Sequence, residues 1–361
     1  MVRKNMNFNG KPLLDLPTPS LVVDLDRVRQ NLENMQHLVS AAGGFLRPHI
    51  KTHKCSTLAR MQIEAGAIGI TCATLGEAEA MARGGIGDLL IANQLVTPDK
   101  LERVALLRKK ADVKFVVDSE QGILAAAYAG KRSCCRFEVL LEVDHGGKRC
   151  GVQASGEAVR LTELILTSPY LIFGGIQAYN GGLSYIQDLT AREHACEESN
   201  DLLISFVDAI IKLCPIPRVS GAGTGHAANA LQASPITEVQ SGSYIYSDTT
   251  YRELAPDYLP ALSVLTTVLS RPSATRVVMD AGLKSIGTEF SKPEIPQYPG
   301  LDFDHFSEEH MQWEARLGSI PEIGEKVLVL PSHCCTTVSH YQECFIVQGK
   351  TVVDCWTIDA Y

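Results

Sequence analysis

The sequence predicts an α/β protein, a (β/α)8 TIM-like barrel followed by a C-terminal β domain. Eight short runs of strand-forming residues alternate with helix-like stretches, which is the rhythm of parallel βα units. These runs extend over roughly 230 residues, a length typical of a closed eight-stranded barrel. After residue 260, strand-like runs follow one another without long helices between them. We therefore expect the barrel at 18–260 and the β domain at 261–361, with residues 1–17 packed on the β domain.

The barrel strands are predicted from short apolar runs rich in β-branched residues. The stretch after the first run is helix-like, because Val28, Leu32 and Met35 recur at spacings of four and three. Ser119 ends a later run and offers an N-cap oxygen to the next helix. An open doubly wound sheet is the competing fold, and the number of strands favours the barrel. The eight candidate strands are 20–25, 45–50, 69–74, 88–93, 114–119, 137–143, 171–179 and 218–224.

The β domain is predicted from strand-like segments that no long helix separates. The stretch 291–312 is rich in Pro, Asp and His and is expected to form an extended loop. The strand-like segments are 264–271, 275–283, 325–333 and 343–356.

Composition restricts the function. Of 361 residues, 45% are apolar and 20% are charged, and the formal net charge is −8, which argues against a nucleic-acid binder. No run of about 18 apolar residues occurs, and no apolar signal segment follows the basic N-terminus, so we expect no membrane association. Eleven cysteines, an odd number scattered along the chain, indicate a reducing, cytoplasmic location rather than a disulfide framework.

Polar side chains follow many of the predicted strands, and the strand ends form the active face of such a barrel. Lys51 comes directly after an apolar run, among Arg47, His49 and His53, whose positive charge would favour the neutral amine. It is either an ordinary solvated loop lysine or a partly desolvated amine able to form a Schiff base. The polar residues at strand ends are His49, Lys51, Thr74, Asn93, Asp118, Asp144, Arg149, Gln177, Tyr179 and Thr224.

Two glycine-rich segments lie late in the predicted barrel. SGAGTG at 220–225 is expected to be a strand-to-helix turn, and EVQSGSY at 238–244 is expected to be a strand that runs into small residues and a tyrosine. Glycines let the backbone approach a phosphate, and free N–H groups at a helix start bind the anion. Two such loops near the last strands are typical of a barrel phosphate site. Two ordinary tight turns are the alternative interpretation.

The segment PSHCC at 331–335 contains a candidate metal pair. On a strand, His333 and Cys335 would point to one face and Cys334 to the other. Imidazole and thiolate suit Zn²⁺, and two ligands leave open positions for water or substrate. The alternative is a histidine beside ordinary buried cysteines.

Together these motifs resemble the D-threonine aldolase and D-serine dehydratase-like family of pyridoxal-phosphate enzymes, which is related in fold to alanine racemase. The elements RPHIKTHK and PSHCC are specific and lie far apart in the chain, and the similarity covers nearly all of it. The matching segments are 18–36, 47–54, 142–152, 174–182, 221–225, 237–244, 280–285, 331–337 and 352–358.

The resemblance implies that Lys51 forms the Schiff base with pyridoxal phosphate and that Arg149 contacts the phenolic oxygen of the cofactor. Gln240 stands where alanine racemases place an arginine against the pyridine nitrogen, and a neutral amide there predicts a weaker electron sink. The catalytic residues implied are Lys51, His49, Tyr179 and Asn180. The cofactor contacts implied, besides Lys51, Arg149, Tyr179 and Gln240, are Gly223, Thr224, Gly242, Ser243 and Tyr244.

Two departures from the family pattern divide the assignment of the reaction. Many bacterial D-threonine aldolases have histidine where this chain has Asn180, and their metal motif is commonly His-x-Asp. Here the pair is His333 and Cys335, as in D-serine dehydratases, whereas the body of the sequence looks like the aldolases.

The resemblance therefore implies a lyase that uses pyridoxal phosphate and a divalent metal, zinc first and Mn or Mg as alternatives. The expected reaction is retro-aldol cleavage of a small D-β-hydroxy-amino acid to glycine and an aldehyde. The alternatives are dehydration of D-serine or D-threo-3-hydroxyaspartate to a keto acid and ammonia, an amino-acid racemase, and a non-catalytic cofactor carrier. A cytoplasmic homodimer is expected.

Overall fold

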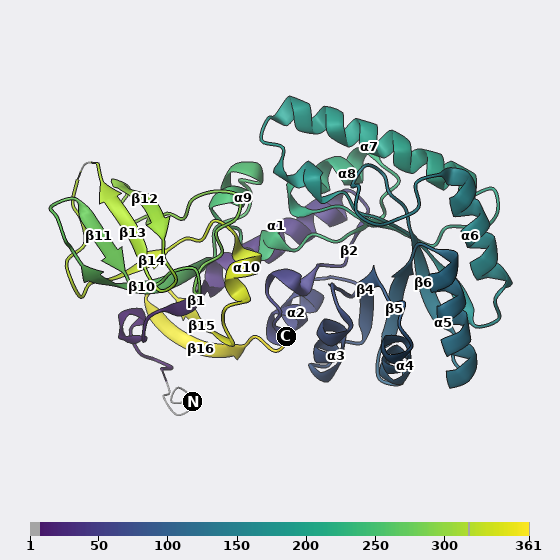
Figure 1. Ribbon diagram of the computed structural model, residues 1–361, viewed down its shortest axis with the longest axis horizontal. Helices are drawn as coiled ribbons and strands as arrows, with labels where there is room; N and C mark the ends of the chain where they lie inside the picture. The colour runs from purple at the N-terminus through teal and green to yellow at the C-terminus, as the bar shows by residue number, and fades with distance from the viewer. Residues whose placement is uncertain (1–7, 317, 361) are drawn as a thin grey trace. The chain divides into compact units, whose positions relative to one another are not determined.

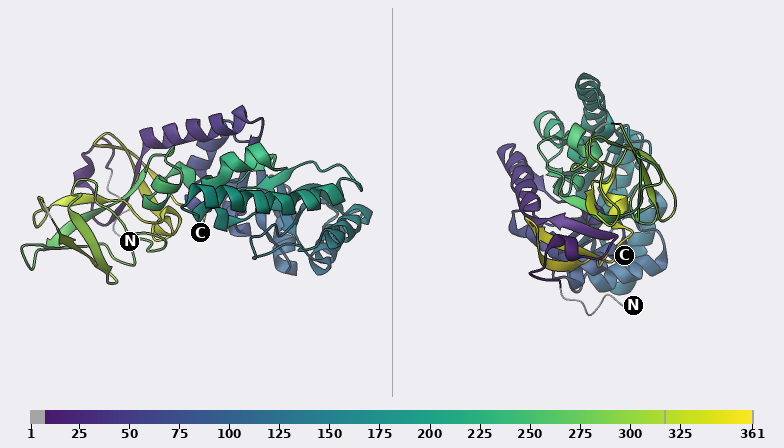
Figure 2. Two further views of the ribbon diagram at one scale, coloured as in Figure 1. Left: turned by 90° about the horizontal axis from the view of Figure 1, so that it is seen from above. Right: turned by 90° about the vertical axis from the view of Figure 1, so that its left-hand side faces the viewer.

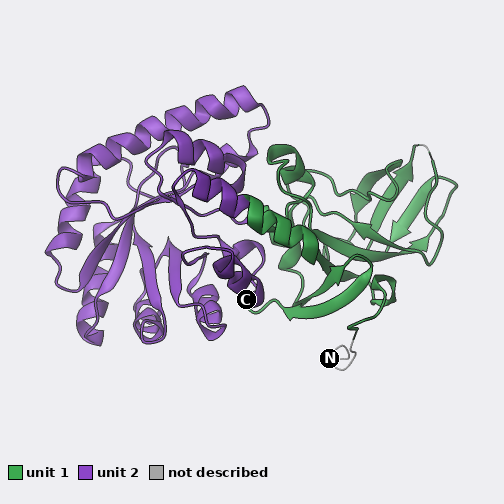
Figure 3. Cartoon of the chain, turned by 180° about the vertical axis from the view of Figure 1, so that it is seen from behind, with its two compact units in different colours: residues 1–34, 243–359 green, residues 35–242, 360–361 purple. Residues whose placement is uncertain are grey.

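The computed structural model describes residues 8–316 and 318–360. The chain divides into two compact units, unit 1 with Met1–Asn34 and Ser243–Asp359, and unit 2 with Met35–Gly242 and Ala360–Tyr361 (Figure 3). The first boundary falls inside helix α1 (Leu25–Ala41) and the second follows Gly242. These positions differ from the boundaries at 18 and 260 that the sequence suggested.

Unit 2 is a parallel β barrel, which confirms the predicted fold class. Its strands pair in the order β2-β9-β8-β7-β6-β5-β4-β3, and every pair is parallel. A parallel bridge between His49 and Thr71 joins the ends of this series and closes the barrel. The strands are β2 (Phe45–Leu46), β3 (Ile70–Cys72), β4 (Asp88–Gln94), β5 (Asp112–Val117), β6 (Phe137–Glu142), β7 (Leu171–Ala178), β8 (Val219–Gly221) and β9 (Glu238–Val239).

Helices lie outside these strands (Figure 1). Helix α7 has 22 residues and is a single continuous helix in the left view of Figure 2. Ser119 caps α5, since its hydroxyl accepts a hydrogen bond from the Gly122 amide, as the sequence predicted. Thr74 caps α3 in the same way. The helices are α2 (Ser56–Glu64), α3 (Leu75–Arg83), α4 (Pro98–Leu107), α5 (Glu120–Ser133), α6 (Ser155–Thr167), α7 (Leu189–Ile210) and α8 (Ala227–Ala233).

Unit 1 is built on a mostly antiparallel sheet in the order β12-β13-β11-β10-β1-β15-β16, with β14 paired to β10. Short helices α9 (Thr249–Leu254) and α10 (Cys334–Val338) connect some of its strands. The strands are β1 (Ser20–Asp24), β10 (Leu262–Ser270), β11 (Arg276–Met279), β12 (Leu301–Phe306), β13 (Met311–Ala315), β14 (Lys326–Val329), β15 (Glu343–Gln348) and β16 (Thr351–Thr357).

One predicted barrel strand belongs to this sheet instead. The run 20–25 was expected to open the barrel, but β1 pairs antiparallel with β10 and parallel with β15. The eighth barrel strand is β9, at the start of the segment 238–244, which was predicted to begin as a strand but was not counted among the eight. The expected loop at 291–312 likewise contains β12 and the start of β13. An apolar run shows that a strand forms, but it does not specify a partner more than 200 residues away.

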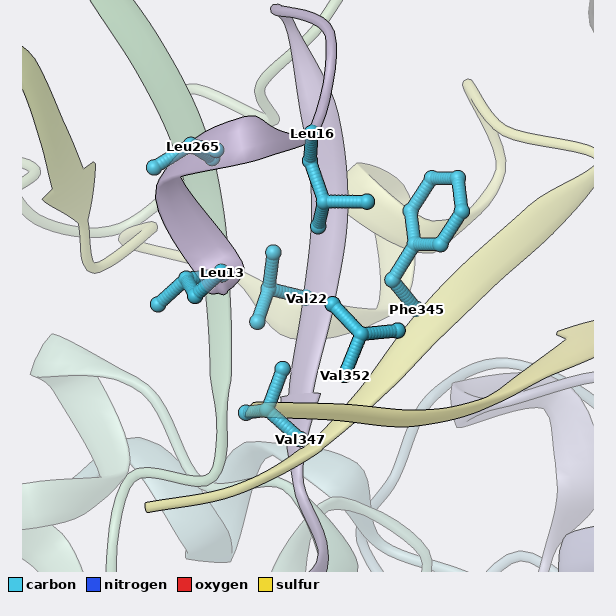
Figure 4. Packing of buried hydrophobic residues seen from close by; sticks show 7 residues of the cluster. All are labelled: Leu13, Leu16, Val22, Leu265, Phe345, Val347 and Val352. Carbon is cyan, nitrogen blue, oxygen red and sulfur yellow. The ribbon is translucent and has the colours of Figure 1, made fainter. Parts of the chain in front are cut away.

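An apolar cluster holds the N-terminal part of unit 1 against its sheet (Figure 4). Leu16 is fully buried and Leu13 nearly so, and both pack with Val22 of β1 and Phe345 of β15. None of the helices within residues 8–316 and 318–360 is long and apolar enough to cross a membrane.

Candidate active site

Lys51 lies in a single 3-10 turn, η3 (Ile50–Thr52), directly after the short strand β2. His49 caps this turn, and its ring Nδ1 accepts a hydrogen bond of 3.3 Å from the Lys51 backbone amide. Because His49 also forms the bridge that closes the barrel, the turn is fixed at the seam between β2 and β3. Local structure therefore holds the lysine at the C-terminal rim of the barrel.

The side chains of Lys51, Arg149 and Tyr179 meet in one cavity of about 180 Å³. The Lys51 ammonium lies 5.3 Å and the Arg149 guanidinium 5.1 Å from the centre of the Tyr179 ring. Three residues that the sequence placed at different strand ends thus share one site. The cavity is lined by His49, Lys51, Ala73, Ala92, Asn93, Gln94, Arg149, Cys150, Gln177, Tyr179 and Gln240.

His49 is a neutral ring in this cavity. Burial lowers its pKa well below the usual value, and the nearby charges of Lys51, Arg149 and His53 lower it further. The Nδ1 atom accepts a hydrogen bond from the Lys51 backbone amide, so the proton of the neutral ring is on Nε2. His49 therefore presents a hydrogen-bond donor rather than a base.

A buried carboxylate that the sequence analysis did not single out positions Arg149. Glu142, at the end of β6, lies 3.4 Å from the Arg149 guanidinium and accepts a hydrogen bond from Gln94. Burial raises the pKa of Glu142, while Arg149 and Gln94 act against that rise. Gln94 and Cys150 were also missed, although each directly follows a residue already recognised at a strand end.

Gln240 follows β9 and is nearly fully buried. Its side-chain nitrogen donates to Gln177 Oε1 at 3.1 Å and to Ser220 Oγ at 2.8 Å. The Gln177 side chain, in the same cavity wall, also interacts with Glu142 and acts to lower the pKa of that carboxyl.

The glycine-rich turn after β8 is closely packed, because a Cβ atom at Gly221 would lie 1.9 Å from the Ala178 carbonyl oxygen. The glycine-rich pattern predicted free N–H groups here, but the Gly223 amide donates to His226 Nε2 at 3.3 Å. Burial lowers the pKa of His226 to about 3, so the ring is neutral and its Nδ1 donates to Ser184 Oγ. Thr224 is buried beside it at the start of η5 (Thr224–His226).

Gly242 lies against the Lys51 turn. A Cβ atom there would meet the His49 carbonyl oxygen at 2.6 Å and Thr52 Oγ1 at 2.8 Å, so only glycine fits without a shift. The next two residues, Ser243 and Tyr244, belong to unit 1 and begin η6 (Ser243–Ile245), where Tyr244 is fully buried.

Asn180 is buried outside the set of residues that line the cavity. Its side-chain nitrogen donates to Ser199 Oγ of α7 at 3.3 Å, and the same oxygen contacts His145 Nδ1 at 2.9 Å. The structure thus brings Lys51, His49 and Tyr179 together and directs the Asn180 amide nitrogen towards α7.

The metal pair lies in unit 1, and its local structure differs from the prediction. His333 is the N-cap of α10, and Cys334 and Cys335 are helical, so strand alternation does not apply. The pKa of His333 is raised overall. Burial acts to lower this pKa, but the contact with Cys335 raises it, and Asp248 and Glu289 add smaller increases. Cys334 is fully buried, as expected for the other face, because the turn of the helix directs it inward.

Polar groups surround the His333 ring. His333 Nδ1 lies 3.2 Å from Thr336 Oγ1 and 3.5 Å from a Glu289 oxygen, and the ring also interacts with the Cys335 thiol. Cys335 Sγ lies 3.8 Å from Ser243 Oγ. Within residues 8–316 and 318–360, no three His, Cys, Asp or Glu side chains are arranged to hold a metal ion. The imidazole and the thiolate in this segment are donor types that a borderline-soft cation such as Zn²⁺ takes.

The cavity in unit 2 suits pyridoxal phosphate by the chemistry of its donors. It contains an amine at Lys51 for the aldehyde and a guanidinium at Arg149 for the phenolic oxygen. The side-chain amides of Gln177 and Gln240 add polar groups to the wall of the same cavity.

Comparisons with known proteins agree with this geometry. Residues 23–250 match the family described as alanine racemase, N-terminal domain, and residues 261–347 match the putative serine dehydratase domain. The D-threonine aldolase of Arthrobacter sp is 32% identical over 357 residues, covering 97% of this chain and 94% of the relative. The D-threo-3-hydroxyaspartate dehydratase of Delftia sp. (strain HT23) is 31% identical, covering 95% and 97%.

Solved structures give the same result. The D-threonine aldolase from Filomicrobium marinum has a TM-score of 0.95 and 33% identity, with 98% of both chains covered. The Delftia dehydratase has a TM-score of 0.86 and 28% identity, with 96% of this chain and 98% of that chain covered. Two variants of a D-threo-3-hydroxyaspartate dehydratase are also solved, one changing a histidine to alanine and one changing a cysteine two positions later, the latter in a metal-free form. Family match and fold extend over almost the whole sequence, and the chain belongs to the D-threonine aldolase and D-serine dehydratase-like family of pyridoxal-phosphate-dependent lyases.

Proposed function

We propose that the protein cleaves small D-β-hydroxy-amino acids, such as D-threonine, to glycine and an aldehyde, using pyridoxal phosphate and a divalent metal. The observation that carries this proposal is the single cavity in which Lys51, Arg149 and Tyr179 meet. The high similarity to two D-threonine aldolases favours this reaction over other lyase chemistry.

In this proposal Lys51 holds the cofactor covalently and Arg149, braced by Glu142, contacts its phenolic oxygen. When bound to the substrate amine, pyridoxal phosphate withdraws electrons from Cα and weakens the bonds to that atom. His49 donates a hydrogen bond from Nε2, and Tyr179 forms the wall between the two cations. Gly242 allows the following loop to approach the lysine turn. The phosphate is assigned to Gly223, Thr224, Gly242, Ser243 and Tyr244.

His333 and Cys335 are the proposed metal ligands, and zinc is the expected ion because thiolate and imidazole prefer it over Mn²⁺ or Mg²⁺. The bound ion would supply a Lewis acid for the substrate hydroxyl. Support comes from the two D-threo-3-hydroxyaspartate dehydratase variants, in which the altered residues are a histidine and a cysteine with the same spacing.

That shared spacing also favours a second candidate reaction. A dehydratase would remove the β-hydroxyl of D-serine or D-threo-3-hydroxyaspartate and release a keto acid and ammonia. The donor pair resembles the dehydratase, whereas identity over the chain is slightly higher to the aldolase. We expect either enzyme to be a cytoplasmic homodimer.

One assay separates these reactions. The protein, loaded with pyridoxal phosphate and Zn²⁺, is incubated with D-threonine, D-serine, D-threo-3-hydroxyaspartate and L-threonine. Glycine, aldehyde, keto acid and ammonia are measured together. Glycine and acetaldehyde from D-threonine alone support the aldolase. Keto acid and ammonia in equal amounts support the dehydratase, and no product from any D-substrate would overturn both.

A further inference from the structure

A directed chain of hydrogen bonds runs through the barrel interior to the cavity, and it begins at an ion pair. Arg47 and Glu238 are both almost fully buried, and their side chains are 3.0 Å apart. Arginine only donates hydrogen bonds, so the Glu238 oxygen that faces it, Oε1, is an acceptor.

The acceptor at Glu238 sets the direction of the next hydrogen bonds, at Ser220 and Gln240. Ser220 Oγ donates its only hydrogen to Glu238 Oε1 at 2.5 Å, so toward Gln240 it can only accept. The Gln240 atom 2.8 Å away must therefore be the amide nitrogen. Its second hydrogen goes to Gln177 Oε1 at 3.1 Å. Both donors of the amide are used, and Oε1 is the atom that Gln240 offers to the cavity it lines.

Pyridoxal phosphate has only one group that matches such an acceptor. Its aldehyde carbon bonds to the lysine, and its phosphate and phenolate oxygens accept hydrogen bonds. The hydrogen on the lysine-bound nitrogen is held by the adjacent phenolate oxygen, so the ring nitrogen, when protonated, is the one group left to donate. We propose that Gln240, oriented by Ser220 and Glu238, accepts a hydrogen bond from the protonated ring nitrogen of the cofactor. This proposal rests on the proposed function, since it requires the cofactor at Lys51.

The consequence reverses the expectation drawn from the sequence. A neutral amide at this position predicted a weak electron sink, because an amide cannot supply a charged donor. An amide fixed as an acceptor instead favours the pyridinium form, which withdraws electrons more strongly from the substrate Cα. Gln240 is a cofactor-binding residue in this arrangement, and Ser220 and Glu238 are positioning residues.

The test is ¹⁵N NMR of protein loaded with pyridoxal phosphate labelled at the ring nitrogen, recorded as a function of pH. We expect a protonated nitrogen at neutral pH in the wild-type protein. Gln240→Met, similar in size but without the acceptor, is expected to lower the midpoint of protonation by about one to two pH units, as for loss of one charge-assisted hydrogen bond. Ser220→Ala frees the amide to rotate and is expected to shift the midpoint in the same direction.

Gln94→Met is the matched control, because Gln94 lines the same cavity but is directed to Glu142 and Asp118. It is expected to leave the ring-nitrogen midpoint unchanged. Borohydride reduction and peptide mapping come first, and absence of label on Lys51 would overturn the proposed function and this proposal with it. Label on Lys51 together with an unprotonated ring nitrogen at neutral pH, or an unshifted midpoint in both variants, would overturn this proposal alone.

Discussion

At the scale of single residues, Lys51 is distinguished from the other lysines by its surroundings. Lys51 is half-buried in the cavity, and its ammonium lies 5.3 Å from the centre of the Tyr179 ring. The Lys54 ammonium instead lies 3.9 Å from a Glu77 carboxylate oxygen. The sequence indicates Lys51 as a candidate because it follows an apolar run. The neighbours that make it a site residue, Glu142 and Gln94, act through contacts between strands that no local pattern encodes.

We predict that Lys51→Ala removes covalent binding of pyridoxal phosphate and reduces activity by at least about a thousandfold, since the covalent attachment point is lost. The measurement is borohydride reduction followed by peptide mapping, together with the visible absorbance of the bound cofactor. Lys54→Ala is the control and is expected to keep the label. Label recovered on Lys54 or Lys284 in the wild-type protein would show that the assignment is wrong.

His226 makes stability depend on pH in a defined direction. Its pKa is about 3 in the folded protein, because of burial, against 6.5 for an ordinary histidine. Between these values the unfolded chain binds an extra proton, so the free energy of unfolding falls as the pH decreases below 6.5. The slope from this group is about 1.4 kcal/mol per pH unit.

Urea unfolding at pH 7 and pH 5 tests this contribution. His226→Gln is expected to be less stable at pH 7, because the contacts with Gly223 and Ser184 are lost. Its further loss between pH 7 and pH 5 should be smaller than that of the wild-type protein by about 2 kcal/mol. Parallel losses in the two proteins would mean that His226 is protonated in the folded state.

At the scale of elements, the sequence predicted which segments form strands better than it predicted their partners. Local hydrophobic patterns predicted the strands of the barrel and of the β domain. Local capping chemistry predicted the N-cap at Ser119. The partner of β1 did not, because its register with β10 and β15 depends on residues far along the chain. The segment after His333 forms a helix of five residues, too short for its period to be recognised in the sequence.

We predict that Gly242→Ala disturbs the lysine turn. The added methyl group would overlap the His49 carbonyl oxygen and Thr52 Oγ1. Overpacking of this kind costs about 1–3 kcal/mol, so affinity for pyridoxal phosphate should fall about tenfold or more by equilibrium titration. Gly182→Ala is the matched control near the same strand ends, because a Cβ there meets only ordinary contact at 3.5 Å. Equal affinities of the two variants would contradict the tight contact.

At the scale of the whole molecule, the two units carry different parts of the proposed chemistry. Unit 2 contains the lysine cavity, and unit 1 contains His333 and Cys335. Activity should therefore need both units, and we expect it to need the homodimer as well. Light scattering at assay concentration tests the last point, and a fully active monomer would rule out a required dimer.

The last prediction concerns removal of the metal. Two protein ligands within one short segment, the start of α10, cannot cross-link a domain as a four-ligand site does. Chelation should therefore abolish activity while the melting temperature and the visible absorbance of bound pyridoxal phosphate stay nearly unchanged, and added Zn²⁺ should restore turnover. Cys335→Ser should behave like the chelated protein. Cys334→Ser should retain metal-dependent activity, since Cys334 is fully buried and its amide donates to Asp248. Full activity after exhaustive chelation, or equal loss of metal binding in both cysteine variants, would exclude His333 and Cys335 as the metal pair.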